Sequence, residues 1–256
     1  MPENTHTVLV VGATGSIGRY VITLALDAGF ETRALVRDRA KAAGIPAGAH
    51  IVVGDLTDPG TLRDAVAGVT GIVFTHGSYG GAREAEAVDY GAVRNVLSVL
   101  SSPARIALMT TIGVTKHTPG HDWKRRGERL VRASGLPYTI VRPGWFDYND
   151  SDQHRLVMLQ GDTRWASDPS DGVISRAQIA QVLVSSLTCD AANRKTLELV
   201  AEPGPAQTDL SPLFAELHAD PATALDAVLD RDNMPLTEEP FRVMADLEAI
   251  RGRFAV

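Results

Sequence analysis

The sequence is poor in cysteine and in aromatic residues, and its charge does not have the sign that binds polyanions. Its one cysteine, Cys189, has no partner for an internal disulfide, and the Cys and His residues show no paired spacing typical of a structural zinc site. We therefore expect a reducing compartment and no metal. With 25 Lys and Arg against 31 Asp and Glu, the net charge is −6, which argues against nucleic acid or an anionic membrane surface as the partner.

The start of the chain also lacks a long apolar run. The apolar stretch before Gly12 is too short for a signal-peptide core or a membrane span, which predicts a cytoplasmic location. The hydrophobic fraction of 44% in 256 residues is nevertheless enough for a substantial core. The sequence therefore predicts a globular protein, a monomer or a homodimer, whose partner is a small-molecule substrate.

Short β-branched runs alternate with longer stretches of helical period, a pattern typical of parallel strands joined by crossover helices. We predict strands at 7–11, 32–36, 50–53, 71–75, 105–110, 138–141 and 196–200, and helices at 16–28, from 37, at 58–68, 82–102 and 121–134, and from 175, 211, 220 and 237. The polar stretch 142–173 has no clear period, so we expect a functional loop. Residues 1–256 are predicted to form one α/β domain, with 142–173 and a small C-terminal helical lobe, 203–256, contributing the substrate pocket.

The strongest signal is VLVVGATGSIGRYV, in which three glycines are spaced three residues apart between a predicted strand and an amphipathic helix. Such a turn brings the backbone close to a pyrophosphate, and the helix N-terminus offers N–H groups to its negative charge. The residues that we expect to bind a dinucleotide here are Gly12, Thr14, Gly15, Ser16, Ile17 and Gly18. The alternative is a glycine-rich turn without a ligand.

The end of the second strand distinguishes the two nicotinamide dinucleotides, because a carboxylate there binds the ribose 2′-hydroxyl whereas a cation binds a 2′-phosphate. Arg37 holds this place, with Arg33 and Arg39 nearby, which favours NADP and leaves NAD possible. Asp38 next to it argues the other way. Arg37 could also be a solvated residue at the start of a helix.

Two further strand ends are candidates for the cofactor site. After the third strand, Asp55 can accept a hydrogen bond from the adenine amino group and Leu56 can cover its ring, although Asp55 is equally consistent with a simple turn residue. After the fourth strand, Thr75, His76 and Gly77 lie where backbone usually lines a dinucleotide. For His76 the plainer interpretation is a loop histidine.

Several segments together resemble a known superfamily: GATGSIG, ALVRD, GDL, MTTIGV, WKRRGERLVRASGLPYTIVRPG and DGVISRAQIA, in that order over residues 8–188. They are similar to the atypical short-chain dehydrogenases/reductases, in particular to the NAD(P)H-binding branch that includes nitrogen-metabolite-repressor-like proteins. This resemblance implies a Rossmann-like, doubly wound parallel sheet with the cofactor bound across its switch point.

In the family pattern a Ser or Thr ends the fifth strand and a Tyr lies four residues before a Lys on the next helix. The resemblance identifies these positions as Thr110 or Thr111 and Lys124, but Gly120 stands where the Tyr would be. Glycine cannot donate the proton that accompanies hydride transfer. Lys124 is still expected to bind the nicotinamide ribose, and Thr111 to orient a substrate oxygen. His121 is the first candidate to replace the missing acid.

Other interpretations of these residues stay open. His117 and Tyr79, which is also expected beside the substrate, are weaker candidates for the acid, and an acceptor that takes its proton from water needs none. The Lys124-Arg125-Arg126 run is typical of a solvated helix face, and Lys124 with Glu128 of a surface ion pair.

After the sixth strand, the resemblance implies that Pro143 and Gly144 pass beside the nicotinamide while Trp145 and Phe146 begin the substrate wall. An apolar wall suits a flat or aromatic acceptor, although the two rings could instead pack against C-terminal helices. The sequence favours an NADPH-preferring oxidoreductase that transfers hydride to a small carbonyl, quinone or aromatic acceptor. The alternatives are an NAD(P)-binding sensor or regulator without turnover, and an NAD-dependent enzyme of the epimerase or dehydratase type.

Overall fold

One β-sheet organises the protein, and the computed structural model describes residues 6–78 and 80–254. Its strands are β1 (Thr7–Val11), β2 (Glu31–Val36), β3 (His50–Val53), β4 (Gly71–Phe74), β5 (Arg105–Met109), β6 (Tyr138–Pro143), β7 (Trp145–Phe146), β8 (Arg155–Leu159), β9 (Val173–Ile174) and β10 (Lys195–Glu202). Their order is β3-β2-β1-β4-β5-β6-β10-β9-β7, with β8 paired to β10. Every pairing from β3 to β10 is parallel, whereas β8 and β9 run antiparallel to β10. The chain reverses its winding direction at β1, as in a Rossmann-like, doubly wound sheet.

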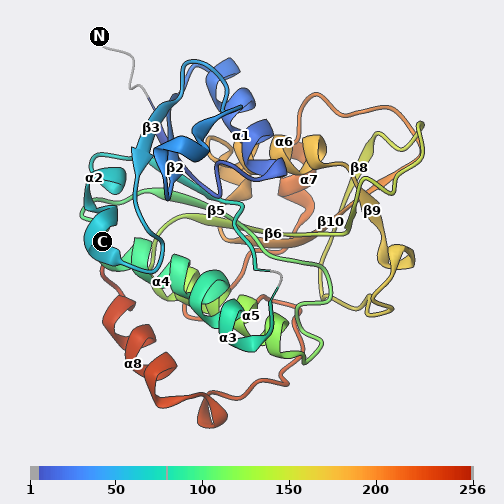
Figure 1. Ribbon diagram of the computed structural model, residues 1–256. Coiled ribbons are helices and arrows are strands. Elements are labelled where there is room, and N and C mark those ends of the chain that lie inside the picture. Colours follow the sequence, from blue (N-terminus) through green and yellow to red (C-terminus); the bar gives the residue numbers. More distant parts are fainter. Residues whose placement is uncertain (1–5, 79, 255–256) are drawn as a thin grey trace.

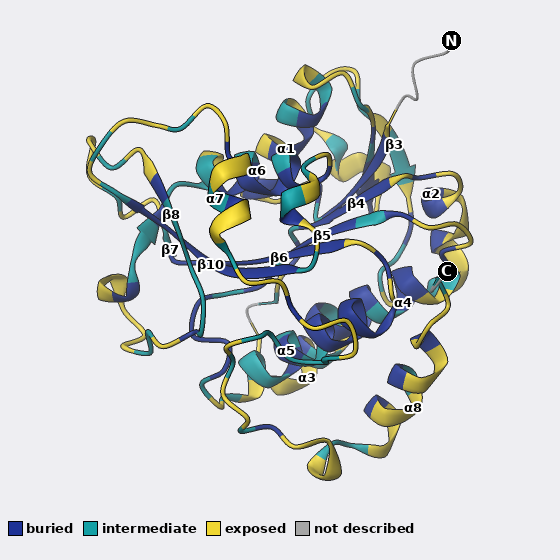
Figure 2. Ribbon diagram, turned by 180° about the vertical axis from the view of Figure 1, so that it is seen from behind, coloured by how far each residue is buried: buried dark blue, intermediate teal, exposed yellow. Residues whose placement is uncertain are grey.

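Helices cover both faces of this sheet (Figures 1 and 2). One face carries α1 (Ser16–Asp27), α6 (Arg176–Ser186) and α7 (Ser211–Glu216), and the other α2 (Arg63–Val66), α3 (Ala82–Ala85), α4 (Gly91–Val99), α5 (Pro119–Ala133) and α8 (Phe241–Ile250). A π-helical turn, Glu86–Tyr90, joins α3 to α4. The C-terminal helices therefore separate: α7 packs beside β8, and α8 packs on α4 and α5.

Alternation along the strands builds an apolar core on each face. Val8 and Val10 of β1 point toward α1 and α6, whereas Leu9 and Val11 point toward α4 and α5. The sequence predicts these strands well, because their bounds lie within two residues of the expected ones. The predicted start of α6 is confirmed by a capping box, in which the Ser175 hydroxyl accepts the N–H of Gln178.

Three expectations about the second half are wrong. Residues 142–173 are not a loop throughout, because they contain β7, β8 and β9; such short strands at the sheet edge have too few residues to show a period. No helix begins at Asp220, whose buried carboxylate instead accepts hydrogen bonds from Tyr138 and Thr196. The last helix, α8, begins at Phe241 after Pro240 rather than at 237.

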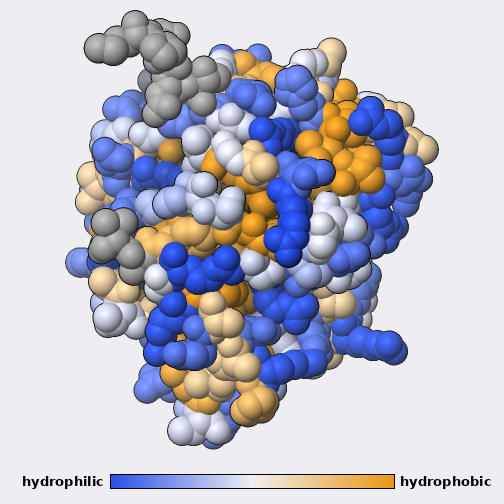
Figure 3. Space-filling view, turned by 90° about the vertical axis from the view of Figure 1, so that its left-hand side faces the viewer, coloured by the Kyte–Doolittle hydropathy of each residue, from blue (hydrophilic) through white to orange (hydrophobic). Residues whose placement is uncertain are grey.

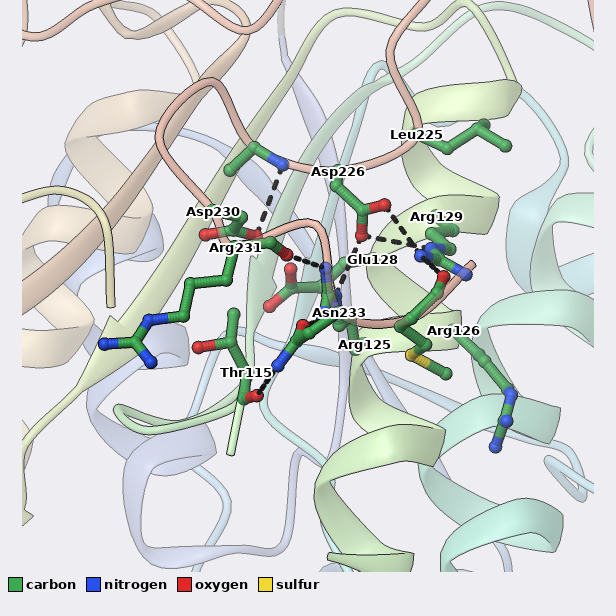
Figure 4. Close-up of polar contacts among 12 residues, drawn as sticks. Thr115, Arg125, Arg126, Glu128, Arg129, Leu225, Asp226, Asp230, Arg231 and Asn233 are labelled. Carbon is green, nitrogen blue, oxygen red and sulfur yellow. Dashed lines mark hydrogen bonds and ion pairs between the residues drawn. The ribbon is translucent and has the colours of Figure 1, made fainter. Parts of the chain in front are cut away.

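The basic run on α5 is also not the solvated face that its sequence suggests. Arg125 is buried and binds Asp226 at 2.8 Å, and Arg126 binds Glu239 at 2.6 Å. Glu128 is fully buried and binds Arg142 of β6 at 2.7 Å rather than forming a surface pair with Lys124. Figure 4 shows how Asp226 of the C-terminal segment reaches Arg125 and Arg129 of α5. The segment 219–240 thereby covers β6 and β10 in place of a crossover helix.

The surface carries both polar and apolar residues. On the face at the β3 end of the sheet, charged side chains are interspersed with apolar ones (Figure 3). Within residues 6–78 and 80–254, no helix combines the length and the apolar character needed to cross a bilayer.

Candidate functional site

The glycine turn lies between β1 and α1, where it packs against the end of β4. Gly12 has φ +92°, and a Cβ there would lie 2.7 Å from the backbone nitrogen of His76. A Cβ on Gly18 would lie 2.2 Å from the carbonyl oxygen of Gly12, so α1 starts this close to β1 because both residues are glycine. The N–H of Gly15 donates to the same oxygen at 2.9 Å and closes the turn.

The N-terminus of α1 fits an anion. Gly15 is the N-cap and supplies no side-chain hydrogen bond to the first-turn N–H groups, which include those of Ile17 and Gly18. The Ser16 hydroxyl accepts a hydrogen bond from Arg176 Nε at 2.9 Å, and Arg176 also pairs with Asp147. Thr14 is exposed in the turn. A helix N-terminus with an arginine beside it suits the pyrophosphate of a dinucleotide.

The end of β2 presents Arg37, with its side chain exposed. Asp38 is occupied locally, because its carboxylate accepts the N–H of Ala40 at 2.9 Å. The carboxylate of Asp55 accepts the N–H and the hydroxyl of Thr57 at 2.8 and 2.7 Å; these bonds, with a smaller contribution from Arg37, lower the pKa of Asp55. Asp55 thus acts as a turn residue here, which leaves its second oxygen for a further donor.

Loops after β3 and β4 are tied to their neighbours. The carbonyl oxygen of Leu56 accepts a hydrogen bond from Asn95 Nδ2 on α4 at 2.7 Å. The hydroxyl of Thr75 donates to the carbonyl oxygen of Val11 at 3.1 Å, which joins the carboxyl ends of β4 and β1. These contacts hold the walls expected around the adenosine half of a dinucleotide.

His76 and Lys124 meet at Asp89, in the π-helical turn. The His76 ring is buried, its Nε2 lies 3.3 Å from the carbonyl oxygen of Asp89, and burial lowers the pKa of the ring to about 4, so it is neutral at neutral pH. Lys124 Nζ lies 2.5 Å from the carboxylate of Asp89. A Cβ on Gly77 would lie 3.8 Å from this ammonium, which places Lys124 beside the end of β4. Binding of a ribose by Lys124 would be shared with Asp89.

The two threonines after β5 have different surroundings. The Thr110 hydroxyl is buried and donates to Glu128 at 2.7 Å, so it is taken up by the protein itself. Thr111 is half-buried and lines the cavity described below. Of these two threonines, Thr111 is therefore the one that lines the cavity.

A cavity of about 430 Å³ opens at the carboxyl ends of β5 and β6. Six of the residues expected around the nicotinamide and the substrate line it: Thr111, His121, Pro143, Gly144, Trp145 and Phe146. Tyr79 lies outside the described residues. The lining residues all fall between 111 and 171. From the segment 203–256, Arg231 and Asn233 contact the cavity loops from behind: the Arg231 guanidinium lies 4.1 Å from the centroid of the Trp165 ring, and Asn233 donates to the carbonyl oxygen of Thr115 at 3.0 Å.

Two close contacts shape the walls of this cavity. Gly144 and Gly172 touch, since a Cβ on Gly144 would lie 2.4 Å from the carbonyl oxygen of Gly172, and this contact brings β7 beside β9. Asp162 is buried and accepts the N–H groups of Gly113 and Thr115, both at 2.6 Å. It thereby fastens the loop after β5 to the segment that carries Trp165.

His121 lies in the first turn of α5, where its N–H donates to the hydroxyl of the N-cap Thr118. Its buried Nδ1 has no hydrogen-bond partner within the described part of the chain. Nothing lies within 4 Å of the place where Gly120 would carry a Cβ, so the position of the missing Tyr is open space. His117, by contrast, is bound to Asp122 and to the carbonyl oxygen of Asn233.

The sequence did not predict the part of the cavity wall formed by the loop after β5 and the segment that carries Trp165. The lining residues that it did not single out are Ile112, Gly113, Lys116, Trp165, Ser167 and Asp171. The aromatic content of 142–173 indicated the region, but not which aromatic residue faces the site. The MTTIGVTK segment ends in Lys116, yet only the fold brings that lysine to Trp165.

The sheet order, the glycine turn and a cavity at the ends of β5 and β6 together are those of a Rossmann-like fold of the kind that binds dinucleotides. Residues 12–190 match the model of the NAD(P)H-binding family, so the chain belongs to that family. A putative NAD-dependent epimerase/dehydratase from Bacillus halodurans shares the fold, with a TM-score of 0.67 and 22% identity over 83% of this chain and 100% of that one.

Two relatives of this chain have different roles. Sanguinarine reductase of Eschscholzia californica is 25% identical over 264 residues, covering 82% of this chain and 96% of that protein. The photosystem II assembly factor Ycf39 of Cyanophora paradoxa is 28% identical over 203 residues, covering 76% of this chain and 63% of that protein. The chain is thus similar to a reductase over nearly the whole reductase, and to part of an assembly factor.

Proposed function

We propose that this protein is an NAD(P)H-dependent reductase, with NADPH preferred, that transfers hydride to a flat carbonyl, quinone or aromatic acceptor. One observation carries the proposal: the cavity at the ends of β5 and β6 joins Thr111 and His121 to the aromatic wall of Trp145 and Phe146. A dinucleotide held at the glycine turn extends along the carboxyl ends of the strands toward this cavity. The likeness to sanguinarine reductase supports the same reaction class.

The reaction balances with few protein groups. A bound reduced nicotinamide supplies a hydride, which is two electrons and one proton. A quinone or carbonyl takes that hydride and one further proton, giving a hydroquinone or an alcohol. The protein therefore has to orient the acceptor, keep water away from the hydride and deliver one proton.

The residues around the cavity can meet these needs. The Thr111 hydroxyl can donate to the acceptor oxygen, and the unpartnered Nδ1 of His121 makes this ring available for proton transfer. Trp145 and Phe146 offer a flat apolar surface. Lys124, held by Asp89, stands where a ribose hydroxyl can reach it. The absent Tyr matters less for an acceptor such as a quinone, which can take its proton from water.

The preference for NADPH rests on Arg37. Its guanidinium is exposed at the end of β2, and Asp38 is engaged by Ala40, so a 2′-phosphate would meet a cation there. Arg37→Asp should weaken NADPH binding about 10- to 100-fold more than NADH binding. Arg251→Asp, at the end of α8, is the matched charge change away from the site. An equal loss of affinity for both cofactors in Arg37→Asp would contradict this assignment.

The first experiment is titration calorimetry with NADPH and NADH, followed in the same buffer by cofactor oxidation with a panel of quinones, flavins and aromatic ketones. We expect binding, and oxidation that depends on the acceptor. Gly15→Val should abolish binding, because a side chain there intrudes on the pyrophosphate turn, while circular dichroism keeps its helical signal. Retained binding by a folded Gly15→Val would overturn the role of the turn.

A second candidate function is cofactor binding without turnover, as in a sensor or an assembly protein. Two observations favour it: the Tyr position is occupied by Gly120, and Ycf39 is among the relatives. Tight binding of NADPH with no oxidation by any acceptor in the panel would support this candidate against the reductase.

A further inference from the structure

One lysine in the cavity wall forms no ion pair with the described residues, and its charge is left for a ligand. Lys116 lines the cavity, and its ammonium donates to two neutral oxygens, the carbonyl of Trp165 at 2.9 Å and the hydroxyl of Ser167 at 3.0 Å. Across residues 6–78 and 80–254, no carboxylate lies within 4.0 Å of this ammonium. A lysine has three N–H donors, so its charge and one donor are left for a ligand.

The acidic group in the cavity wall forms no ion pair with this lysine. Asp171 is the carboxylate of the lining, and its two oxygens accept the N–H groups of Ala166 and Ser167 at 2.8 and 2.7 Å. Two more cations stand behind the wall. Arg231 covers the Trp165 ring, and Arg164 donates to the carbonyl oxygen of Asp171 at 3.0 Å.

Two residues of the same wall each have a ring nitrogen without a hydrogen-bond partner. Trp165 Nε1 and His121 Nδ1 are buried, and neither has a hydrogen-bond partner in the described part of the chain. Buried polar groups are nearly always hydrogen-bonded, and an indole N–H can only donate. Among the described residues, the indole N–H of Trp165 therefore lacks an acceptor, as does the third N–H of the Lys116 ammonium, so acceptor oxygens are what this wall lacks.

Hydrogen bonds fix the loop that carries Lys116, so the position of the lysine's backbone in the cavity wall is defined. Asp162 accepts two N–H groups of this loop, and the carbonyl oxygen of Thr115 accepts a hydrogen bond from Asn233 at 3.0 Å. The N–H of Lys116 itself donates to the carbonyl oxygen of Gly113 at 2.9 Å.

We propose that the acceptor carries an acidic group, a carboxylate, a sulfonate or an ionised hydroxyl, and that Lys116 binds this group while the aromatic wall holds the ring system. The inference rests on the proposed reductase function and narrows its substrate class to anionic aromatic compounds. Uncharged or cationic aromatic compounds of the same size are poorer substrates, because they leave the charge of the ammonium without a counter-ion.

The test uses a matched pair of acceptors, 1,2-naphthoquinone-4-sulfonate and 1,2-naphthoquinone. In Lys116→Met the kcat/KM for the sulfonate, divided by that for the neutral quinone, should fall at least tenfold relative to the unaltered protein. The division removes the difference in reactivity between the two quinones. Lys116→Arg should keep most of the ratio, and Arg251→Met, a loss of one positive charge far from the cavity, should leave it unchanged.

A binding measurement separates this inference from the reductase proposal. Naphthalene-2-sulfonate cannot be reduced, and its binding can be followed by quenching of tryptophan fluorescence; we expect a roughly tenfold weaker affinity in Lys116→Met. If the sulfonate binds through Lys116 but no acceptor oxidises NADPH, the reductase proposal fails and the anion site stands. A ratio unchanged in a folded Lys116→Met, or equal binding by both proteins, overturns the anion site.

Discussion

Helices cover both faces of the sheet, but the two faces are held by different interactions. The face under α1 and α6 is apolar, with side chains such as Val73, Val141, Leu183 and Leu197 packed together. The opposite face is apolar under α4, but over β6 and β10 it becomes ionic. There the strands present Arg142 and Glu198, and the cover is the C-terminal segment.

The ionic face forms a continuous network around Glu128 and Arg142. Arg142 binds both oxygens of Asp230 at 2.7 Å and also binds Glu128, which in turn accepts the hydroxyl of Thr110. Next to it, Arg132 binds Asp220 at 3.2 Å. Figure 4 shows the outer part of this network, where Arg129 reaches Asp226.

The two faces therefore differ in how they respond to substitution and to pH, and in what they hold in place. Apolar packing tolerates exchange of side chains of similar volume and is insensitive to pH. Buried ion pairs contribute less net stability, but each pair fails when one partner is removed. A segment without regular structure gains a defined position from such pairs, and this position fixes Asn233 and Arg231 against the loops of the cavity.

Removing one member of the ionic network should have the largest effect. Arg142→Met leaves Asp230 buried without its arginine and leaves Glu128 with Arg132 alone, at 3.4 Å. We expect a loss of about 3–5 kcal/mol in the free energy of unfolding. The loss should grow from pH 5 to pH 8, because acids that lost their cation have raised pKa values and must be ionised at the higher pH. Urea unfolding at both pH values measures it.

Adding Asp230→Asn to Arg142→Met is the control, because it removes one of the stranded charges and should recover part of the stability. A single variant as stable as the unaltered protein would show that the network is replaceable by apolar contacts and would remove the contrast between the faces.

On the apolar face, Leu183→Ala should cost about 2–5 kcal/mol through lost transfer energy and the cavity left in α6. Leu183 is fully buried among other apolar side chains, so the cost should be the same at pH 5 and pH 8. Parallel urea curves at the two pH values test this. A pH-dependent cost would mean that the two faces are coupled and that the comparison is false.

The titration of Glu198 should have a smaller effect on the free energy of unfolding, and the direction of its pH dependence is defined. Burial raises the pKa of its carboxyl to about 8, although Arg142 opposes the shift, and nearby Asp162 adds to it. The folded protein then holds a proton that the unfolded chain has lost above about pH 4.5, so stability falls as the pH rises toward 8. Glu198→Gln removes this titration and should be roughly 1–3 kcal/mol more stable than the unaltered protein at pH 8.5, with little difference at pH 4.5.

The sequence predicts the apolar half of this molecule and not the ionic half. Strand and helix bounds follow from periodicity, and the glycine turn from its spacing, because each of these signals is local. The Lys124-Arg125-Arg126 run has the composition of a solvated helix face. Its burial depends on acids about a hundred residues further along the chain, such as Asp226, that only the fold brings near.

The candidate site divides in the same way. Thr111, Trp145 and Phe146 follow the ends of predicted strands, so the sequence already indicates that they share one edge of the sheet. Lys116 and Trp165 meet because Asp162 fastens one loop to another, and no local pattern reports such a contact. Site residues that come from two loops held together by tertiary contacts are therefore the ones that a single sequence does not predict.

Removing one partner of an exposed ion pair should change the free energy of unfolding least. The comparison with Arg142→Met shows how much burial adds to the cost of breaking a pair. Arg155 and Glu202 pair across β8 and β10, with side chains 47% and 42% exposed. Glu202→Gln should change the free energy of unfolding by less than about 0.5 kcal/mol, because water screens both charges. Urea unfolding in low and high salt checks this, since any contribution should vanish at about 1 M salt. A cost comparable with that of Arg142→Met would mean that ion pairing itself, and not the desolvation of the stranded partner, governs the ionic face.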